Sequence, residues 1–315
     1  MQEGALKNVN VVFIGGQSRS GSTLLDLMLG QVEGFLSLGE LQYIWQRGFL
    51  ENHLCGCGKE FRQCTFWGNV VEEMFGSFQQ MDLQHLCTLW NTIERQWYFF
   101  VFPYLAGATS YREKLSEYTC ALGKLFTAIQ KVSGKQFLVD SSKKPFHGFL
   151  LHAIPTVDLR VIHLIRDCRA VGYSWQRKKL RPEVHWKKDY MEIFSPAYMA
   201  MDWNFRNGAM DILGSIIEHY TMVQYETLAR DPSGVLKDLL AYLEVDVVPP
   251  PILQHGEFEL TVHHTVGGNP MRFQRGRIPV TPDLEWKRSM PVRHKMLTTL
   301  LSWPLLLRYG YLTIR

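Results

Sequence analysis

The sequence has no run of eighteen or more apolar residues, the length that a membrane-spanning helix requires. Its beginning does not have the pattern of a secretory signal, because Asn8 and Asn10 interrupt the apolar stretch, which then runs into a glycine loop. We therefore expect a cytoplasmic protein without a membrane span. The Golgi or secretory lumen is the alternative if an anchor precedes this sequence.

The net charge is small and cysteines are few. The net charge of +4 suits an anionic ligand but is too small for a nucleic-acid-binding protein. Six cysteines in 315 residues are too few and too unevenly spread for a disulfide-built scaffold.

Three of the cysteines follow His53, as Cys55, Cys57 and Cys64. Structural zinc sites usually pair their ligands with a wider gap, and no second pair follows here, so we expect no metal. A disulfide from Cys64 to Cys55 or Cys57 is the alternative if the protein is secreted.

Short apolar segments alternate with segments of helical periodicity. The predicted strands are Val9–Ile14, Gln136–Val139, Leu159–Ile165 and Tyr220–Tyr225. The predicted helices are Thr23–Gln31, Tyr111–Val132, Ala170–Lys179, Ala197–Leu213, Ser233–Leu243 with Asp231 as its N-cap, and the apolar tail Leu297–Leu307. Such alternation predicts one parallel sheet covered by helices on both faces. We predict a single domain over residues 1–315, with loop insertions around 47–65 and 247–283.

The first predicted strand runs into a loop that is suited to holding a phosphate. Its sequence is Gly15-Gly16-Gln17-Ser18-Arg19-Ser20-Gly21-Ser22-Thr23, followed by a leucine-rich helix. Glycines let the backbone amides turn inward, and the helix start adds unpaired N–H groups. The spacing is nearly that of the nucleotide-binding P-loop, but Ser22 stands where the lysine belongs and Arg19 supplies the cation instead. Ordinary magnesium-dependent phosphoryl transfer is therefore disfavoured.

A second basic site follows the third predicted strand. Arg166 comes directly after that strand, at the edge where α/β folds bind their ligands. Ser174 lies eight residues later, two turns into the next helix, and can approach the same anion. Arginine offers forked hydrogen bonds to a phosphate, and serine adds a neutral donor.

These two sites together resemble those of sulfotransferases that use 3′-phosphoadenosine-5′-phosphosulfate (PAPS), most of all the tyrosylprotein and the bacterial or carbohydrate-type enzymes. The family's first loop binds the 5′-phosphosulfate, which here implies Gln17, Ser18, Arg19, Ser20, Gly21, Ser22 and Thr23. Its Arg…Ser pair binds the 3′-phosphate, which implies Arg166 and Ser174. The resemblance spans Val9 to Leu228 and implies a three-layer, P-loop NTPase-like α/β domain with a central parallel sheet. PAPS would be the donor and 3′-phosphoadenosine-5′-phosphate (PAP) the product, with no metal required.

The resemblance also implies the catalytic side chains. Glu40, in Leu38-Gly39-Glu40-Leu41, matches the Gly-Glu of tyrosylprotein sulfotransferases and would remove the proton of the acceptor hydroxyl. Lys143, before Lys144-Pro145-Phe146, would share with Arg19 the charge of the leaving phosphate. Solvated loop side chains are the alternative for both. His147 and His152 are alternative bases, since histidine has that role in cytosolic sulfotransferases.

Further residues are implied by weaker matches. Tyr225, in Tyr225-Glu226-Thr227-Leu228, matches the family's Tyr-Glu-x-Leu and would close the site. Asn269 and Arg272 lie in a glycine-bearing basic segment like the one that covers the donor's 3′-phosphate and adenine. The stretch from Cys55 to Trp67 resembles one in many bacterial sulfotransferases, which supports the resemblance but assigns no role.

Two other functions stay open: a P-loop-type kinase of a small metabolite and a non-catalytic nucleotide-binding scaffold. The kinase would need a phosphate-reaching lysine and a magnesium-binding acid. The expected partner is a hydroxyl-bearing acceptor: a small molecule, a glycan, a peptide or a carrier-bound acyl chain. Aromatic residues between Trp90 and Tyr104 favour a partly apolar acceptor, but the sequence fixes neither its identity nor the oligomeric state.

Overall fold

The computed structural model describes residues 8–95, 109–245 and 257–312. The aromatic stretch from Trp97 to Tyr104 and residues 247–256 of the second predicted insertion therefore lie outside the described residues. The assignment of the whole chain to a single domain stays a prediction.

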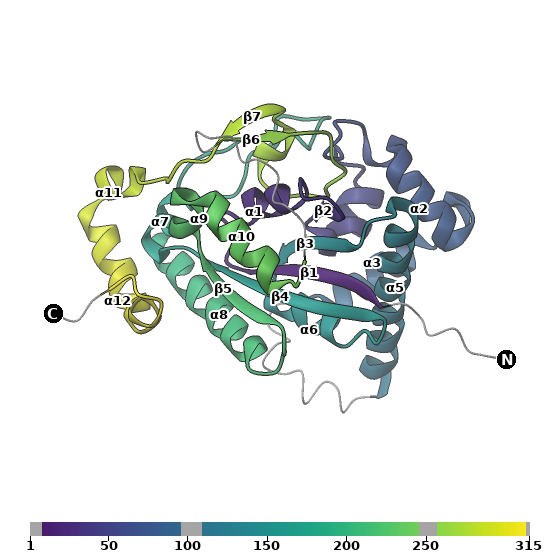
Figure 1. The fold of residues 1–315 in the computed structure, drawn as a ribbon, viewed down its shortest axis with the longest axis horizontal. Helices are drawn as coiled ribbons and strands as arrows, with labels where there is room; N and C mark the ends of the chain where they lie inside the picture. The colour runs from purple at the N-terminus through teal and green to yellow at the C-terminus, as the bar shows by residue number, and fades with distance from the viewer. Residues whose placement is uncertain (1–7, 96–108, 246–256, 313–315) are drawn as a thin grey trace.

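A sheet of five parallel strands forms the centre of the molecule (Figure 1). Its strands are β1 (Val9–Gly16), β2 (Phe35–Gly39), β3 (Phe137–Lys143), β4 (Val157–Ile165) and β5 (Tyr220–Gln224), in the order β2-β3-β1-β4-β5. The four predicted strands are confirmed, and β2 is an additional strand at one edge. A short antiparallel pair, β6 (Glu257–Leu260) with β7 (Gly276–Pro279), lies apart from this sheet.

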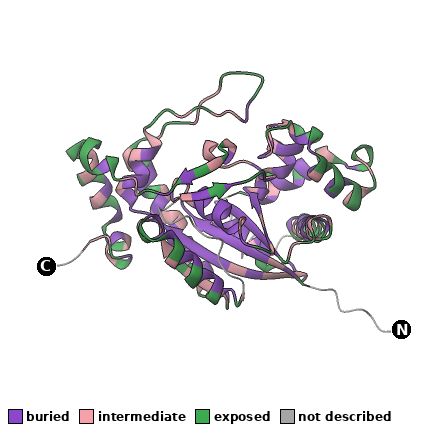
Figure 2. Ribbon diagram, turned by 45° about the horizontal axis from the view of Figure 1, so that its top comes forward, coloured by how far each residue is buried: buried purple, intermediate pink, exposed green. Residues whose placement is uncertain are grey.

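Alternating side chains of β1 point into two separate hydrophobic layers. Val11 and Phe13 pack with α5 (Thr109–Ser133), α6 (Pro145–His152) and α8 (Pro196–Gly214). Val12 and Ile14 pack with α1 (Ser22–Leu29) and α10 (Pro232–Tyr242) on the other face. Burial of both faces is why these strands read as continuous apolar runs. Strands β1 to β4 are mostly buried, β5 is only partly buried, and the outer helix faces are exposed (Figure 2), which confirms the predicted three-layer α/β fold.

The remaining helices are shorter or more peripheral. They are α2 (Thr65–Phe75), α3 (Leu83–Ile93), α7 (Cys168–Trp175), α9 (Tyr225–Arg230), α11 (Glu285–Ser289), α12 (Val292–Arg308), the π-helix Ile44–Leu50 and the 3₁₀ turns Leu41–Tyr43, Phe61–Gln63, Phe78–Gln80 and Pro270–Phe273. The six predicted helices are present with shifted ends. Asp231 caps α10 as predicted, accepting a hydrogen bond from the Gly234 amide at 2.9 Å.

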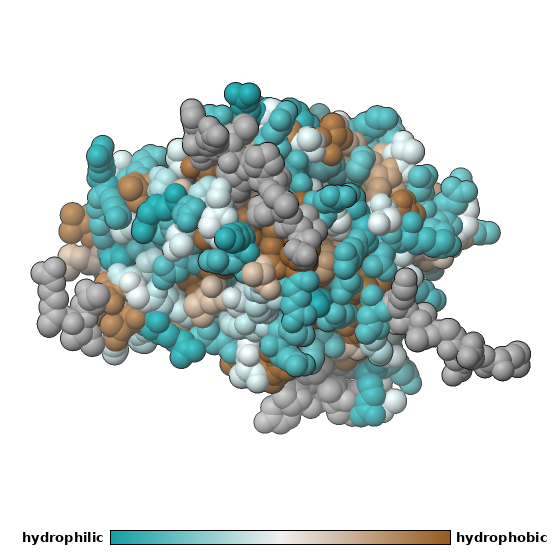
Figure 3. Space-filling model, viewed as in Figure 1, coloured by the Kyte–Doolittle hydropathy of each residue, from teal (hydrophilic) through white to brown (hydrophobic). Residues whose placement is uncertain are grey.

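Helix α12 packs one side onto α7 and α8 and leaves an apolar side outward. The helix is longer than predicted because it begins at Val292 rather than at Leu297. It also continues through Pro304 to Arg308. The end of the molecule where Figure 1 places α12 carries brown, apolar atoms on its surface (Figure 3). Among the described residues, no helix combines the length and the apolar character needed to cross a membrane.

The two predicted insertions meet next to the carboxyl edge of the sheet. Gly39, at the end of β2, forms a parallel bridge with Val266. The Gly56 amide donates to the Thr265 carbonyl at 3.0 Å, which joins the first insertion to the second. Residues more than two hundred positions apart therefore lie side by side there.

Candidate active site

The loop between β1 and α1 lies at the carboxyl end of the central strand. Gly16 and Gly21 have φ angles of 130° and 91°, which favour glycine. A Cβ at Gly21 would meet the Tyr225 ring at 2.5 Å, so the ring packs directly on the loop. No side chain of the described residues caps α1, which leaves the positive end of this helix available to an anion.

Arg166 joins the two predicted anion sites. It follows β4, and its guanidinium donates to the Arg19 carbonyl at 2.9 Å and pairs with Asp283 at 3.0 Å. Its Cζ atom lies 4.3 Å from the centroid of the Tyr225 ring. Tyr225 therefore lies against both the first loop and Arg166, and its closing role stays a prediction. Ser174 is buried on α7, which begins where Asp167 accepts the Arg169 amide at 2.8 Å.

Two guanidinium nitrogens in this region are buried without an acceptor. Arg19 Nη1 and Arg166 Nε have no hydrogen-bond partner within the described part of the chain. Buried polar atoms are almost always paired, so such nitrogens indicate a position that a ligand's oxygen atoms would fill. Arg19 itself has a φ of 73°, and its guanidinium lies 4.9 Å from the centroid of the Trp175 ring.

A cavity of about 590 Å³ connects these residues. Of the predicted site residues it is lined by Ser18, Arg19, Gly21, Ser22, Thr23, Glu40, Lys143, Arg166, Ser174, Tyr225 and Asn269. Its size lies in the range of small-molecule sites, roughly 300–1,000 Å³. Further cationic side chains line it that the sequence analysis did not single out, namely Arg47, Lys179, Arg181 and Arg206. The basic run Arg177-Lys178-Lys179 after Ser174 was the available signal for Lys179.

Glu40 and Lys143 come together because they end neighbouring strands. Glu40 follows β2 and Lys143 ends β3, and their charged groups lie 2.5 Å apart. Arg47 lies 3.7 Å from the other carboxylate oxygen. Burial alone would raise the pKa of Glu40, but Lys143 and Arg47 outweigh it and hold this pKa below its ordinary value. Glu40 is therefore ionised at neutral pH.

Several positively charged side chains besides Lys143 line the same cavity. Burial lowers the pKa of Arg19 to about 10; Glu40 opposes the shift and Arg166 adds to it. Burial, followed by Arg19 and Arg177, lowers the pKa of Lys179 to about 8. A bound anion would stabilise the protonated forms of both side chains and raise their pKa values again.

Some of the predicted site residues are buried beside the cavity and do not line it. Gln17 is buried and donates to Asp202 at 2.7 Å, and Ser20 is buried in the loop. Arg272 is buried, with its terminal nitrogens on the carbonyls of Leu54 and Thr265 at 2.9 and 2.7 Å. None of the three is among the residues lining the cavity.

The two alternative bases also lie outside the cavity lining. His147 is fully buried between Glu94 and Asp140, at 2.5 and 2.9 Å. His152 is exposed at the end of α6. Glu40 is the candidate base that the structure brings next to Lys143.

Asn269 connects the late segment, residues 263–277, to the first loop. Its backbone amide donates to the Thr23 hydroxyl at 3.1 Å, across 246 positions of sequence. Its side chain accepts from the Met271 amide and so begins the 3₁₀ turn Pro270–Phe273. Asn269 thus lines the cavity next to the first loop, whereas Arg272, on the same turn, does not line it; a role of either in binding a cofactor stays a prediction.

Comparisons with known proteins concern the family and the fold of the chain. A family model described as the sulfotransferase family matches residues 11–249. The sulfotransferase domain from the olefin synthase of Synechococcus PCC 7002 has 22% identity and a TM-score of 0.50, with 96% of this chain and 97% of that one covered. A sulfotransferase domain from the curacin biosynthetic pathway has 18% identity and a TM-score of 0.51, with 96% and 98% covered. Both likenesses concern the fold. No curated protein matches the chain.

Proposed function

The chain belongs to the sulfotransferase family, and from this we propose that it transfers a sulfuryl group from PAPS to a hydroxyl group of an acceptor. The observation that carries the donor assignment is the pair of buried guanidinium nitrogens of Arg19 and Arg166 beside one cavity. A donor with phosphate groups on both sides of its ribose would supply acceptors to both arginines.

The residues present suit such a donor. Gly21, Ser22, Thr23 and Arg19 would hold the 5′-phosphosulfate at the start of α1. Arg166 and Ser174 would hold the 3′-phosphate, which would replace the Asp283 carboxylate beside Arg166. Tyr225, at the start of α9, and Asn269, before the 3₁₀ turn Pro270–Phe273, would close the donor site.

The proposed reaction is an in-line displacement at sulfur. Glu40 takes the proton from the acceptor hydroxyl, whose oxygen forms the new S–O bond. The bond between sulfur and the bridging oxygen of the 5′-phosphate breaks, and PAP leaves. Arg19 and Lys143 stabilise the charge that develops on that phosphate. An anion next to Lys143 would weaken its ion pair with Glu40, which would raise the pKa of Glu40 and make it a stronger base.

The acceptor is proposed only as a hydroxyl-bearing compound. The polar lining around Glu40 includes Arg47, Arg181 and Glu183, and Tyr43 and Phe194 add aromatic surface. This mixed lining suits an acceptor with both polar and apolar parts. A cytoplasmic location, expected from the sequence, stays a prediction.

Isothermal titration of the whole chain with PAP and with ATP tests the donor assignment. We expect PAP to bind at least tenfold more tightly, because two basic sites face the cavity. Preference for ATP would contradict the proposal and favour a kinase.

Transfer of labelled sulfate from PAPS to a library of hydroxyl compounds tests the reaction. The Arg19→Ala variant should lose PAP affinity and transfer, whereas Arg308→Ala, which removes an exposed arginine paired with Asp211, should keep both. Tight PAP binding without transfer to any member of a broad library would favour the non-catalytic scaffold.

A further inference from the structure

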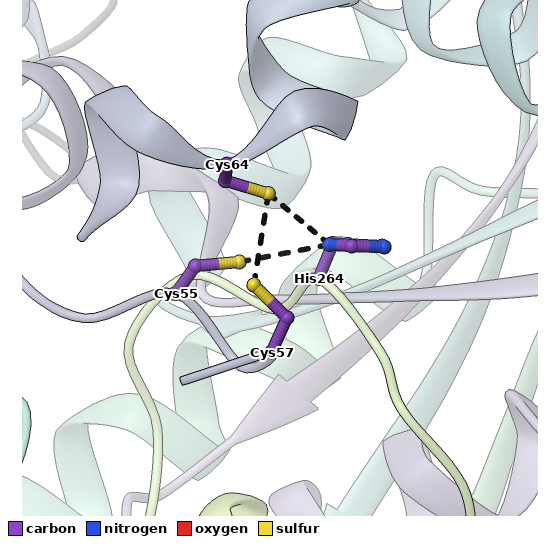
Figure 4. Close-up of side chains that lie close together, drawn as sticks. All are labelled: Cys55, Cys57, Cys64 and His264. Carbon is purple, nitrogen blue, oxygen red and sulfur yellow. Dashed lines mark hydrogen bonds between the residues drawn. The ribbon is translucent and has the colours of Figure 1, made fainter. Parts of the chain in front are cut away.

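Three cysteines and a histidine from distant parts of the chain meet at one point (Figure 4). The sulfur atoms of Cys55, Cys57 and Cys64 and Nδ1 of His264 all lie within 4.8 Å of one another. Cys57 Sγ lies 3.8 Å from Cys64 Sγ, and His264 Nδ1 lies 3.2 Å from Cys64 Sγ and 3.9 Å from Cys55 Sγ. In Figure 4 the four side chains point toward a common centre.

These separations are those of a tetrahedral metal site. With Zn–S distances of about 2.3 Å and Zn–N distances of about 2.0–2.1 Å, the tetrahedron has S···S edges of about 3.8 Å and S···N edges of about 3.6 Å. The S···S distance of 3.8 Å matches the first edge, and the two S···N distances of 3.2 and 3.9 Å lie on either side of the second. A disulfide would require sulfur atoms about 2.05 Å apart, and all six cysteines, each within the described residues, are free.

The local backbone explains how Cys55 and Cys57 act together despite the single residue between them. Leu54 and Glu60 form an antiparallel bridge, and the Cys55 amide donates to the Lys59 carbonyl at 2.8 Å. Gly58 turns the chain with a φ of 89°. This tight hairpin turns both thiols to the same centre.

The other two side chains are held by separate contacts. Cys64 directly precedes α2. The His264 ring stacks on Phe66 with a centroid distance of 5.0 Å and an interplanar angle of 15°. The His264 carbonyl accepts from the Trp67 indole at 2.9 Å. His53, the histidine nearest the cysteines in sequence, pairs with Glu51 at 2.9 Å instead.

We propose that Cys55, Cys57, Cys64 and His264 bind one structural zinc ion. Three thiolates and an imidazole in tetrahedral array are typical of zinc, and four protein ligands leave no open position for a substrate. The ion is therefore structural, which is compatible with a reaction that needs no metal. This proposal replaces the expectation of a metal-free chain, and it does not depend on the proposed sulfuryl transfer.

The zinc would hold the late segment against the first β–α unit. Val266, two residues after His264, accepts a hydrogen bond from the Glu40 amide at 2.6 Å and donates to the Leu38 carbonyl at 2.8 Å. Arg275 donates to the Gly56 carbonyl, between the first two cysteines. The ion would thus fix the backbone on which Glu40 stands from a position outside the cavity lining.

Elemental analysis of the whole chain, purified without added metal, tests the site. We expect about one zinc per chain in the wild type and in Cys120→Ser, which changes an exposed cysteine outside the group. Cys64→Ser and His264→Gln should lose most of the zinc. A wild-type chain that lacks zinc and does not take it up on titration would overturn the proposal, as would retention of full zinc by both variants.

A second measurement covers the case in which those variants do not fold. The wild-type protein is treated with a mercurial thiol reagent while a chromogenic chelator reports released zinc. Zinc release that tracks the blocking of three thiols per ion supports the site. An intact mass two daltons below the reduced chain, with a Cys57–Cys64 crosslink in peptide mapping and no zinc, would overturn it. Cobalt substitution should give the intense visible bands of tetrahedral thiolate coordination, and their absence would also count against it.

Discussion

Glu40 and Lys143 are partly buried charges whose main partners are each other. Lys143 also donates to the Ser141 carbonyl at 3.0 Å, and Arg47 approaches the carboxylate from the other side. Removing one member of such a pair leaves the other uncompensated, so its effect depends on which charge is removed. Loss of the carboxylate leaves Lys143 and Arg47 without their common counter-ion, whereas loss of the lysine leaves the Glu40 carboxylate without its nearest cation.

This asymmetry gives the first prediction. Glu40→Gln should lower kcat for sulfuryl transfer by about 10²–10⁴-fold, because the general base is lost. PAP affinity should be unchanged or higher, because a negative charge is removed from beside Lys143 and Arg19. Rapid-mix assays and titration calorimetry separate the two effects. Glu33→Gln, at an exposed position, is the matched control. A variant with normal kcat would show that Glu40 is not the base.

Lys179 gives a prediction on pH. Its pKa is lowered to about 8, chiefly by burial and then by Arg19 and Arg177, so it is largely protonated at pH 7 and loses its proton above pH 8. An anion binds the protonated form more tightly, so PAP affinity should fall by about tenfold between pH 7 and pH 9. Lys179→Arg keeps its charge over this range and should lose much less affinity. Calorimetric titrations at pH 7, 8 and 9 measure both proteins, and parallel losses would exclude Lys179 as the cause.

At the scale of elements, the sequence predicted those strands that are apolar, β-branched runs followed by polar loop residues. Val9–Ile14 and Leu159–Ile165 are β-branched runs followed by polar site residues, and both are buried central strands. β2 was missed because its five residues, Phe35–Gly39, include a serine and end at a glycine. It is an edge strand that pairs with β3 and bridges Val266 through Gly39, so tertiary packing rather than composition determines it.

The loop between β1 and α1 gives a prediction on backbone geometry. Gly21→Ala places a Cβ against the Tyr225 ring at a φ of 91°, so the loop must shift or remain strained. Such strain costs about 1–3 kcal/mol, and PAP affinity should fall at least tenfold, because the amides at the start of α1 move. Thermal unfolding and PAP titration measure the two effects.

Gly208→Ala is the control for that variant. Gly208 lies in α8, where a Cβ would meet open space, so alanine should be neutral or stabilise the helix by about 0.5–1 kcal/mol. If Gly21→Ala bound PAP like the wild type, the loop would not need the conformation described here.

At the scale of the whole molecule, the site depends on contacts that no local pattern contains. His264 reaches Cys64 across 200 positions, and Asn269 reaches Thr23 across 246. The spacing of the cysteines alone predicted no metal, because the fourth side chain of the group comes from the far end of the chain. The two motifs predicted to bind anions could be read from sequence because each lies within one strand–loop–helix unit.

The core also contains a charged network that affects the stability of the whole fold. His147 contacts Glu94 and Asp140, and although burial opposes it, these two carboxylates raise the pKa of His147 to about 10. A raised folded-state pKa stabilises the protein most below the ordinary histidine pKa of about 6.5, and this contribution is lost as the pH rises toward 10. The wild-type unfolding free energy should therefore decrease over that interval.

Substitution of His147 tests this network. His147→Leu leaves two carboxylates buried without their partner and should cost about 3–5 kcal/mol in urea unfolding at pH 7. His152→Leu, on the exposed end of the same helix, should stay within about 0.5 kcal/mol of the wild type and keep its pH profile. Equal stability of the two variants would contradict a buried charged histidine.

The hydrogen bond between Asn269 and Thr23 has a consequence for biosynthesis. A ribosome that adds about 5–20 residues per second needs about 12–50 s to make the 246 positions between these two residues. During that time the first loop still lacks Arg166, Tyr225 and Asn269, which are made in that order. The cavity beside the first loop is therefore completed only after Asn269 has left the ribosome, so a ligand of this cavity cannot assist the folding of the first strands.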